Sequence, residues 1–155
     1  AVSYSNLGLA WTSLGEYQKA IGYFEKALAI DLRDFGEQHP KVAIQYNNLG
    51  LAWTSLGEYQ KAISLGEYQK AIDYFEKALA IDLKDFGEQH PKVAVSYSNL
   101  GLAWTSLGEY QKAIDYYKKA LAIDLKVFGE QHPHTQTVKS NLEILKKDIS
   151  SSKNQ

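Results

Sequence analysis

Histidine offers the most versatile chemistry of any residue type in this 155-residue chain, which contains four. A histidine serves as a general base near neutral pH, or ligates zinc, when further polar side chains converge on it. His39, His90 and His132 each precede a proline, which holds the residue before it in an extended conformation and leads into a helix. His132 and His134 are two residues apart, but the chain has no Cys to complete a zinc site with them. We therefore expect the three proline-linked histidines to introduce helices, and we expect no metal site.

Other catalytic motifs are missing from the sequence. Without Cys there is no thiol nucleophile and no disulfide framework. No G-x-x-x-x-G-K-[ST] loop is present to hold phosphates, and the recurring Leu-Gly-Glu-Tyr segment has the form of a turn between helices. The sequence predicts a protein that is not an enzyme and that binds no cofactor.

Charge and hydropathy argue against two classes of partner. Lys and Arg number 17 and Asp and Glu number 18, so the formal charge is -1 with neutral His, and no net positive field favours nucleic acid or an anionic membrane. No apolar run reaches the roughly 18 residues that span a bilayer, and the first residues lack the pattern of a secretory signal. We expect a cytoplasmic protein. Because Met is absent even at position 1, we also expect the sequence to be cut from a longer chain.

The elements that position the remaining side chains repeat along the chain. Residues 1–42 and 94–135 align without a gap and differ at only seven positions. The unit between them is nine residues longer, because the nonamer at 55–63 is followed at once by an identical copy at 64–72. The sequence thus predicts three repeats, at 1–42, 43–93 and 94–135, followed by a capping helix and a disordered tail in 136–155.

Each repeat contains two stretches with the three- and four-residue apolar spacing of a helix, and no stretch alternates like a strand, so we expect an all-α fold. In the first repeat, helix A carries its apolar face over residues 4–14 and ends at Gly15. Helix B covers residues 17–35 and ends at Gly36, and Pro40 begins the next helix A. A further apolar stripe near the carboxyl end consists of Val138, Leu142, Leu145 and Ile149.

The apolar positions follow a known pattern in which a large residue, Leu-Gly and an aromatic residue in helix A precede an Ala-x3-aromatic pair and a second Ala in helix B. The three copies are Tyr4, Leu7, Gly8, Trp11, Ala20, Phe24 and Ala27; Tyr46, Leu49, Gly50, Trp53, Ala71, Phe75 and Ala78; and Tyr97, Leu100, Gly101, Trp104, Ala113, Tyr117 and Ala120. This pattern resembles the tetratricopeptide repeat. Leu32, Leu83 and Leu125 replace the proline that ends a 34-residue unit, and the 42-residue variant is similar to the repeat of kinesin light chains and related bacterial arrays.

The resemblance implies a right-handed superhelical solenoid of antiparallel helix pairs, in which the A helices line a concave groove for a peptide or protein partner. The face of helix A opposite its packing side should line that groove. No Asp, Glu, Lys, Arg or His occurs in residues 1–14, 43–56 or 94–107, so we expect an uncharged groove that does not clamp acidic carboxyl-terminal tails. The predicted contact residues are Asn6, Leu9, Thr12, Ser13, Asn47, Asn48, Leu51, Thr54, Ser55, Asn99, Leu102, Thr105 and Ser106.

The duplicated nonamer cannot be structurally silent, because nine helical residues add about 13.5 Å and a net half turn. Four outcomes compete. Helix A of the second repeat extends through Ile63 with the turn at 64–66, or helix B starts at Glu58 and absorbs Gly66. Alternatively the extra copy loops out, or both glycines become helical and the two helices fuse into one rod.

Two functions follow from these patterns. The leading one is a non-enzymatic interaction scaffold with an uncharged concave groove. The alternative is a self-associating structural array, in which the nonamer extends or fuses helices of the second repeat and promotes a domain-swapped homo-oligomer. The partner is then a protein or peptide, including the chain itself, and is neither nucleic acid nor membrane.

Overall fold

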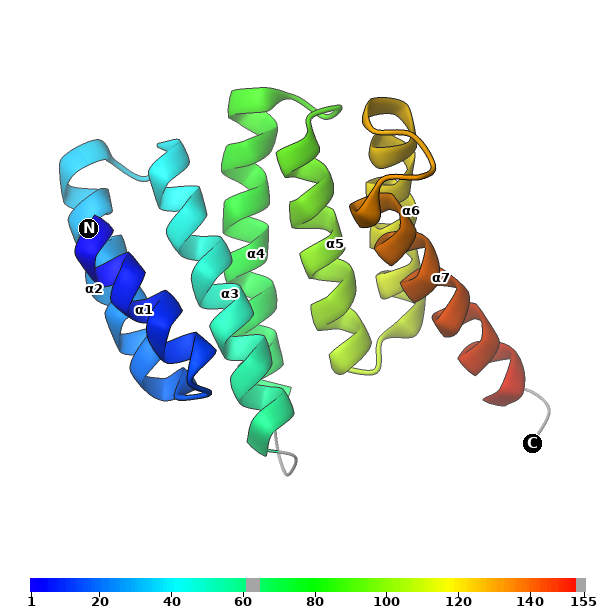
Figure 1. The fold of residues 1–155 in the computed structure, drawn as a ribbon, viewed down its shortest axis with the longest axis horizontal. Helices are drawn as coiled ribbons and strands as arrows, with labels where there is room; N and C mark the ends of the chain where they lie inside the picture. Colours follow the sequence, from blue (N-terminus) through cyan, green and yellow to red (C-terminus); the bar gives the residue numbers. More distant parts are fainter. Residues whose placement is uncertain (61–64, 153–155) are drawn as a thin grey trace. The chain divides into compact units, whose positions relative to one another are not determined.

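The computed structural model describes residues 1–60 and 65–152, and within these ranges all regular structure is helical (Figure 1). The helices are α1 (Val2–Ser13), α2 (Tyr17–Phe35), α3 (Pro40–Gln60), α4 (Leu65–Phe86), α5 (Pro91–Ser106), α6 (Tyr110–Val127) and α7 (Pro133–Ser152). The predicted all-α class is confirmed. The chain divides into two compact units, Ala1–Asp85 and Phe86–Gln155, which are described separately below.

The ends of α1 and α2 lie where the local sequence predicts. Gly15 and Gly36 follow α1 and α2 with φ values of 76° and 82°, a left-handed backbone that glycine adopts without steric cost. The ring nitrogens Nδ1 of His39, His90 and His132 accept hydrogen bonds from the backbone N–H two residues later, at 3.2, 3.1 and 3.2 Å. These histidines therefore cap helices that start at a proline, which confirms the predicted role.

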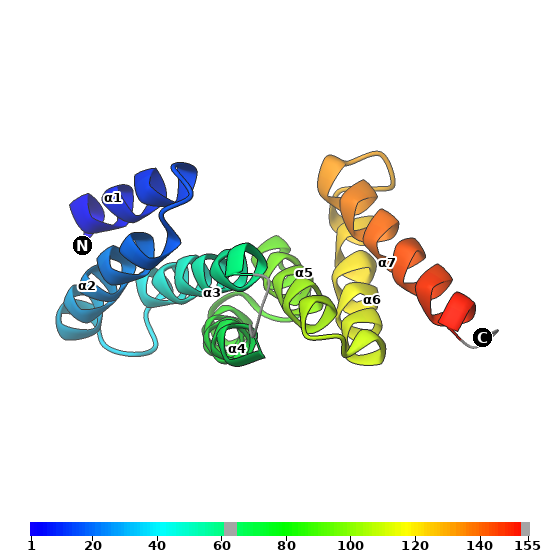
Figure 2. The ribbon, with the colours of Figure 1, turned by 90° about the horizontal axis from the view of Figure 1, so that it is seen from below.

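In the first unit, helices that follow one another in the chain run antiparallel (Figures 1 and 2). The ring of Phe24 on α2 fills the space above Gly8 of α1, and Phe75 on α4 does the same above Gly50 of α3. Two clusters of buried side chains hold these helices together. The first, on α2 and α3, consists of Ala20, Ile21, Phe24, Leu49, Ala52 and Leu56, and Trp11 of α1 packs against it. The second, on α3 and α4, consists of Val42, Ala43, Ala78 and Ile81.

The duplicated nonamer lengthens both helices of the second repeat. Helix α3 continues to Gln60, five residues beyond the position at which α5 ends in the third repeat, and α4 already includes Leu65 and Gly66. The predicted extension of helix A is thus confirmed as far as Gln60, whereas the turn predicted at 64–66 is wrong at Leu65 and Gly66. Residues 61–64, which include Ile63 and Ser64, lie outside the described residues.

None of the other three outcomes predicted for the nonamer is found as a whole. Glu58 belongs to α3, so helix B does not start there, although α4 does include Gly66 as that outcome predicts. The copy does not loop out, because residues 65–72 are helical. A fused rod is excluded by packing, since a Cβ placed on Gly57 would lie 2.8 Å from the ring of Tyr68. Such contacts require α3 and α4 to lie side by side as a hairpin.

In the second unit, α7 lays its apolar stripe on α6. Val138, Leu142 and Leu145 are buried against Ala113, Ile114, Tyr117 and Ala120, and Ile149 packs at the margin of the same cluster. Tyr117 takes the place that Phe24 and Phe75 have in the first unit and lies against Gly101.

Candidate partner-binding groove

The uncharged face of the A helices is accessible in both units, more so in the first. On α1, Asn6, Leu9 and Ser13 are exposed, and Leu9 keeps 50% of its surface. On α3, Leu51 is 41% exposed and lies among half-buried polar side chains, namely Asn47, Asn48 and Ser55. On α5 the corresponding predicted residues are half-buried: Asn99, Leu102, Thr105 and Ser106.

The threonines of this face direct their hydroxyl protons into their own helices. Thr12 donates to the carbonyl of Gly8 at 2.9 Å, Thr54 to that of Gly50 at 2.9 Å, and Thr105 to that of Gly101 at 2.8 Å. Ser13 likewise donates to the carbonyl of Leu9 at 3.1 Å. These predicted contact residues do not keep a free proton for a ligand, and Thr54 is buried, so apolar contact is left mainly to the leucines.

The first unit contains a cavity of about 410 Å³ at the amino ends of α1 and α3 and the carboxyl end of α2. It brings together Asn6, a predicted groove residue of α1, with Ile44 of α3 and with residues of α2, which are outside the predicted groove set. Its apolar walls include Val2, Ile30, Phe35 and Ile44. The volume falls in the range of about 300–1,000 Å³ that is usual for ligand sites.

A chain of polar side chains runs along this cavity. The Ser5 hydroxyl donates to Oε1 of Gln45 at 3.3 Å, and Nε2 of Gln45 donates to Oδ2 of Asp31 at 3.0 Å. Asp31 is only 2% exposed, and its second oxygen, Oδ1, has no hydrogen-bond partner among the described residues. The groove predicted to be uncharged therefore has a buried carboxylate at its edge.

Sequence analysis missed Asp31 because it placed the groove residues on the A helices alone. A signal was present, since Asp31 lies four and three residues after Ala27 and Leu28 and therefore on the buried stripe of its helix. Its equivalents Asp82 and Asp124 are also buried. An acid on the buried stripe of every repeat marks a position at which polar partners must be supplied by the next helix.

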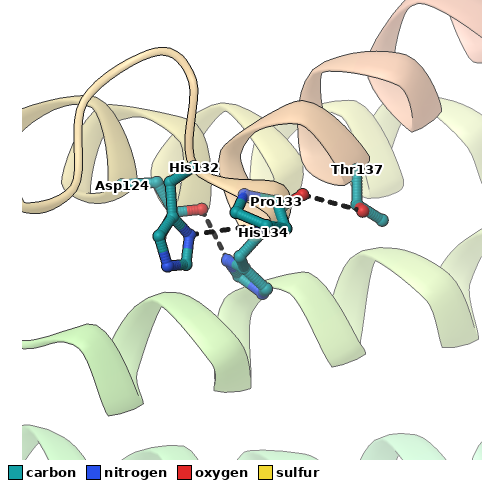
Figure 3. Close-up of polar contacts among 5 residues, drawn as sticks. All are labelled: Asp124, His132, Pro133, His134 and Thr137. Carbon is teal, nitrogen blue, oxygen red and sulfur yellow. Dashed lines mark hydrogen bonds and ion pairs between the residues drawn. The ribbon is translucent and has the colours of Figure 1, made fainter.

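In the second unit, the partner of the equivalent carboxylate is a histidine. Figure 3 shows Nδ1 of His134 pointing at Oδ2 of Asp124, 2.7 Å away. Asp124 is fully buried and the His134 side chain is 27% exposed. Sequence analysis placed no acid beside His134, because ten residues and a turn separate the two in the chain.

A second cavity, of about 120 Å³, lies between α5, α6 and α7. It joins the predicted groove residues Leu102 and Thr105 with Asn141 and Ile144 of α7. Tyr117 also lines it, and burial raises the pKa of the Tyr117 phenol above its ordinary value. In the second unit, α7 thus lies next to the predicted groove residues of α5, as α3 lies next to those of α1 in the first unit.

The tryptophans lie on a different surface from the candidate groove and carry lysines over their rings. Nζ of Lys19 lies 4.5 Å from the ring centre of Trp11, that of Lys70 lies 4.1 Å from Trp53, and that of Lys112 lies 4.3 Å from Trp104. The lysine stems cover indole surface that would otherwise be open to solvent. These half-buried rings complete the packing of each helix pair, as the sequence predicts.

Residues 1–60 and 65–152 contain neither a cluster of metal ligands nor a helix that could span a membrane. No group of three or more His, Asp or Glu side chains in this part of the chain is placed to hold a metal ion. None of the described helices is both long enough and apolar enough to cross a membrane.

Comparison with known proteins gives a family match and several structural neighbours. The family model described as tetratricopeptide repeat matches residues 1–67 and 63–126. Among solved structures, BtubC (BKLC) from P. vanneervenii is 28% identical with a TM-score of 0.82; the match covers 95% of this chain and 55% of that one. The chain thus spans little more than half of that relative's length. A search of curated proteins finds no match.

Two other neighbours show the fold alone. A Podospora anserina putative kinesin light chain with nearly identical TPR-like repeats has 23% identity and a TM-score of 0.79, over 92% of this chain and 64% of that one. The Sgt2 TPR domain from Aspergillus fumigatus has 24% identity and a TM-score of 0.69, over 99% of this chain and 81% of that one.

Proposed function

Because the chain belongs to the tetratricopeptide repeat family, we propose that it is a non-enzymatic scaffold whose A helices present an uncharged groove to a peptide or protein partner. The observation that carries this proposal is the exposure of Leu9 and Leu51 on a face that contains no charged residue. Exposed apolar side chains that gather on one face mark interaction sites. The proposal keeps the cytoplasmic location expected from the sequence.

The composition of the face indicates the kind of partner. Burying one exposed leucine contributes about 1.5–3 kcal/mol, so a partner with apolar side chains gains most from Leu9 and Leu51. Asn6 and Asn48 carry amides that both donate and accept, which suits the backbone of an extended peptide. We therefore propose an extended apolar segment as the ligand, lying along α1 and α3.

Selection of peptides from a random display library, followed by affinity measurement with variants, tests this function. Leu51→Lys places a charge in the groove and should weaken a selected peptide at least about tenfold. Leu14→Lys is the matched control, because Leu14 is an exposed leucine outside the predicted groove set. A peptide whose affinity falls equally with both variants, or with the control alone, would place the binding surface elsewhere.

The alternative function is a self-associating array that forms homo-oligomers, in its most specific form by domain swapping. One observation on α1 favours self-association. Leu7 is 43% exposed there, whereas its equivalents Leu49 and Leu100 are fully buried. Light scattering over a wide concentration range, on this chain and on one lacking residues 64–72, tests the alternative. An oligomer that becomes monomeric on deletion supports assembly through the nonamer, and monomers in both cases contradict it.

A further inference from the structure

The carboxylate of Asp31 is buried without a charged partner. Its Oδ2 accepts from the neutral amide of Gln45, and its Oδ1 accepts from nothing in the described part of the chain. The one lysine that lines the same cavity, Lys41, has its Nζ 4.2 Å from the ring centre of Phe35. A buried carboxylate is stabilised by a cationic partner and by hydrogen bonds to both oxygens. Among the described residues, Asp31 has no cationic partner and no hydrogen bond at Oδ1.

The third repeat supplies a basic side chain at the equivalent place. There Asp124 is bound by Nδ1 of His134 at 2.7 Å, and His134 occupies the sequence position of Lys41. The same carboxylate, on the same turn of helix B, thus accepts a basic nitrogen at hydrogen-bond distance without any change in the fold. In the first unit a cavity of about 410 Å³ adjoins the carboxylate.

The walls of this cavity suit the aliphatic stem of a long basic side chain. Val2, Ile30 and Ile44 present hydrocarbon along which methylene groups can pack. Asp34 also lines the cavity, but its Oδ1 pairs with Nε of Arg33 at 2.8 Å, so Asp31 is the lining carboxylate that has no ion pair among the described residues. The Ser5 to Gln45 contact of 3.3 Å is long for a hydroxyl donor, so this bond holds the Gln45 amide only weakly.

From these observations we propose that the cavity is a subsite for a lysine or arginine side chain of the partner peptide, with the cationic group bound to Asp31. This inference rests on the proposed function and adds to it. The partner has one basic residue set among apolar ones, the apolar residues lie on the leucines of α1 and α3, and the basic residue enters at their amino ends. The groove then favours an apolar segment that carries one basic residue over an apolar segment that carries none.

Four capped heptapeptides that differ only at the central residue provide the test. Their flanks consist of Leu, Ser and Ala, and their central residue is arginine, lysine, citrulline or norleucine. Calorimetry should show the arginine and lysine peptides binding at least about tenfold more tightly than the two neutral ones, since a charge-assisted bond to a buried group is the stronger kind. Asp31→Asn should abolish this preference, and Asp34→Asn, at an exposed carboxylate of the same cavity, should retain it.

A measurement on the unaltered chain tests the same contact without a substitution, in case Asp31→Asn does not fold. The carboxyl-carbon NMR signal of Asp31 should move when the arginine peptide is added, and that of Asp124 should stay in place. Equal affinity for all four peptides, a preference that survives Asp31→Asn, or failure of all four to bind would overturn the inference. The scaffold function is judged separately, because peptides selected from the random library can still depend on Leu51 when none of these heptapeptides binds.

Discussion

Gly50 lies against the ring of Phe75 so closely that a Cβ on the glycine would be 2.5 Å from the ring atom Cε1. The same relationship joins Gly8 to Phe24 in the first repeat. Glycine is required at this position for the close approach of helices A and B, because the helical backbone there does not need left-handed φ. The Leu-Gly pair of the repeat is therefore a packing signature.

Replacing Gly50 by Ala should destabilise the chain by about 1–3 kcal/mol, since the added methyl overpacks the helix pair. Gly22→Ala is the matched control: Gly22 is also within a helix, but nothing lies within 4 Å of its added Cβ. The control should stabilise by up to about 1 kcal/mol through helix propensity. Urea unfolding measures the stability of both variants. If Gly50→Ala is as stable as Gly22→Ala, helices A and B do not approach each other as closely as described.

Stability at alkaline pH should depend on Tyr117. Burial raises the pKa of this phenol in the folded state, so the folded chain holds the proton more tightly than the unfolded chain. The resulting stability is fully present below the ordinary tyrosine pKa of about 10 and is lost as the pH rises through the folded value. Urea unfolding at pH 7, 9, 10 and 11 should show a steeper loss in the unaltered chain than in Tyr117→Phe.

The Tyr117→Phe variant should fold normally at pH 7, because Phe24 and Phe75 occupy the equivalent positions of the other repeats. Tyr59→Phe provides a control at an exposed tyrosine and should leave the pH profile unchanged. If Tyr117→Phe loses stability with pH as steeply as the unaltered chain does, the pKa of Tyr117 does not govern this range.

The contact between His134 and Asp124 should contribute more to stability than the exposed lysine at the equivalent place. His134→Ala leaves a fully buried carboxylate without its partner at Oδ2, which should cost about 1–3 kcal/mol. Lys92→Ala, the same position in the preceding repeat, removes an exposed side chain that lies over Phe86 and should cost less than about 1 kcal/mol. Thermal unfolding at pH 7 compares them, and a smaller cost for His134→Ala would contradict the assignment.

Most of the fold was predictable because its determinants are local. Gly15 and Gly36 end helices through their own backbone conformation, and Pro40 begins one through its missing N–H. The apolar stripe of α7 was predictable for the same reason, since one helix period determines which side chains are buried together. Repetition reinforced the glycine and proline signals, because each of them occurs in more than one repeat.

The partners of buried charges were not predictable, because they depend on which helices become neighbours. Asp31 meets Gln45 only when α3 packs on α2, and Asp124 meets His134 only when α7 packs on α6. The position of the turn around the nonamer was left open for a different reason. Gly57 and Gly66 stand in identical local sequences, so local rules cannot decide which of them ends a helix, and both lie within helices.

The most direct test of the partner-binding groove is an NMR footprint of a library-selected peptide on the backbone amides of the isotope-labelled chain. The shifted amides should gather on the uncharged face of α1 and α3, around Asn6, Leu9, Asn48 and Leu51. Shifts concentrated instead around Lys19 and Lys70, whose side chains cover Trp11 and Trp53, would contradict the proposed groove.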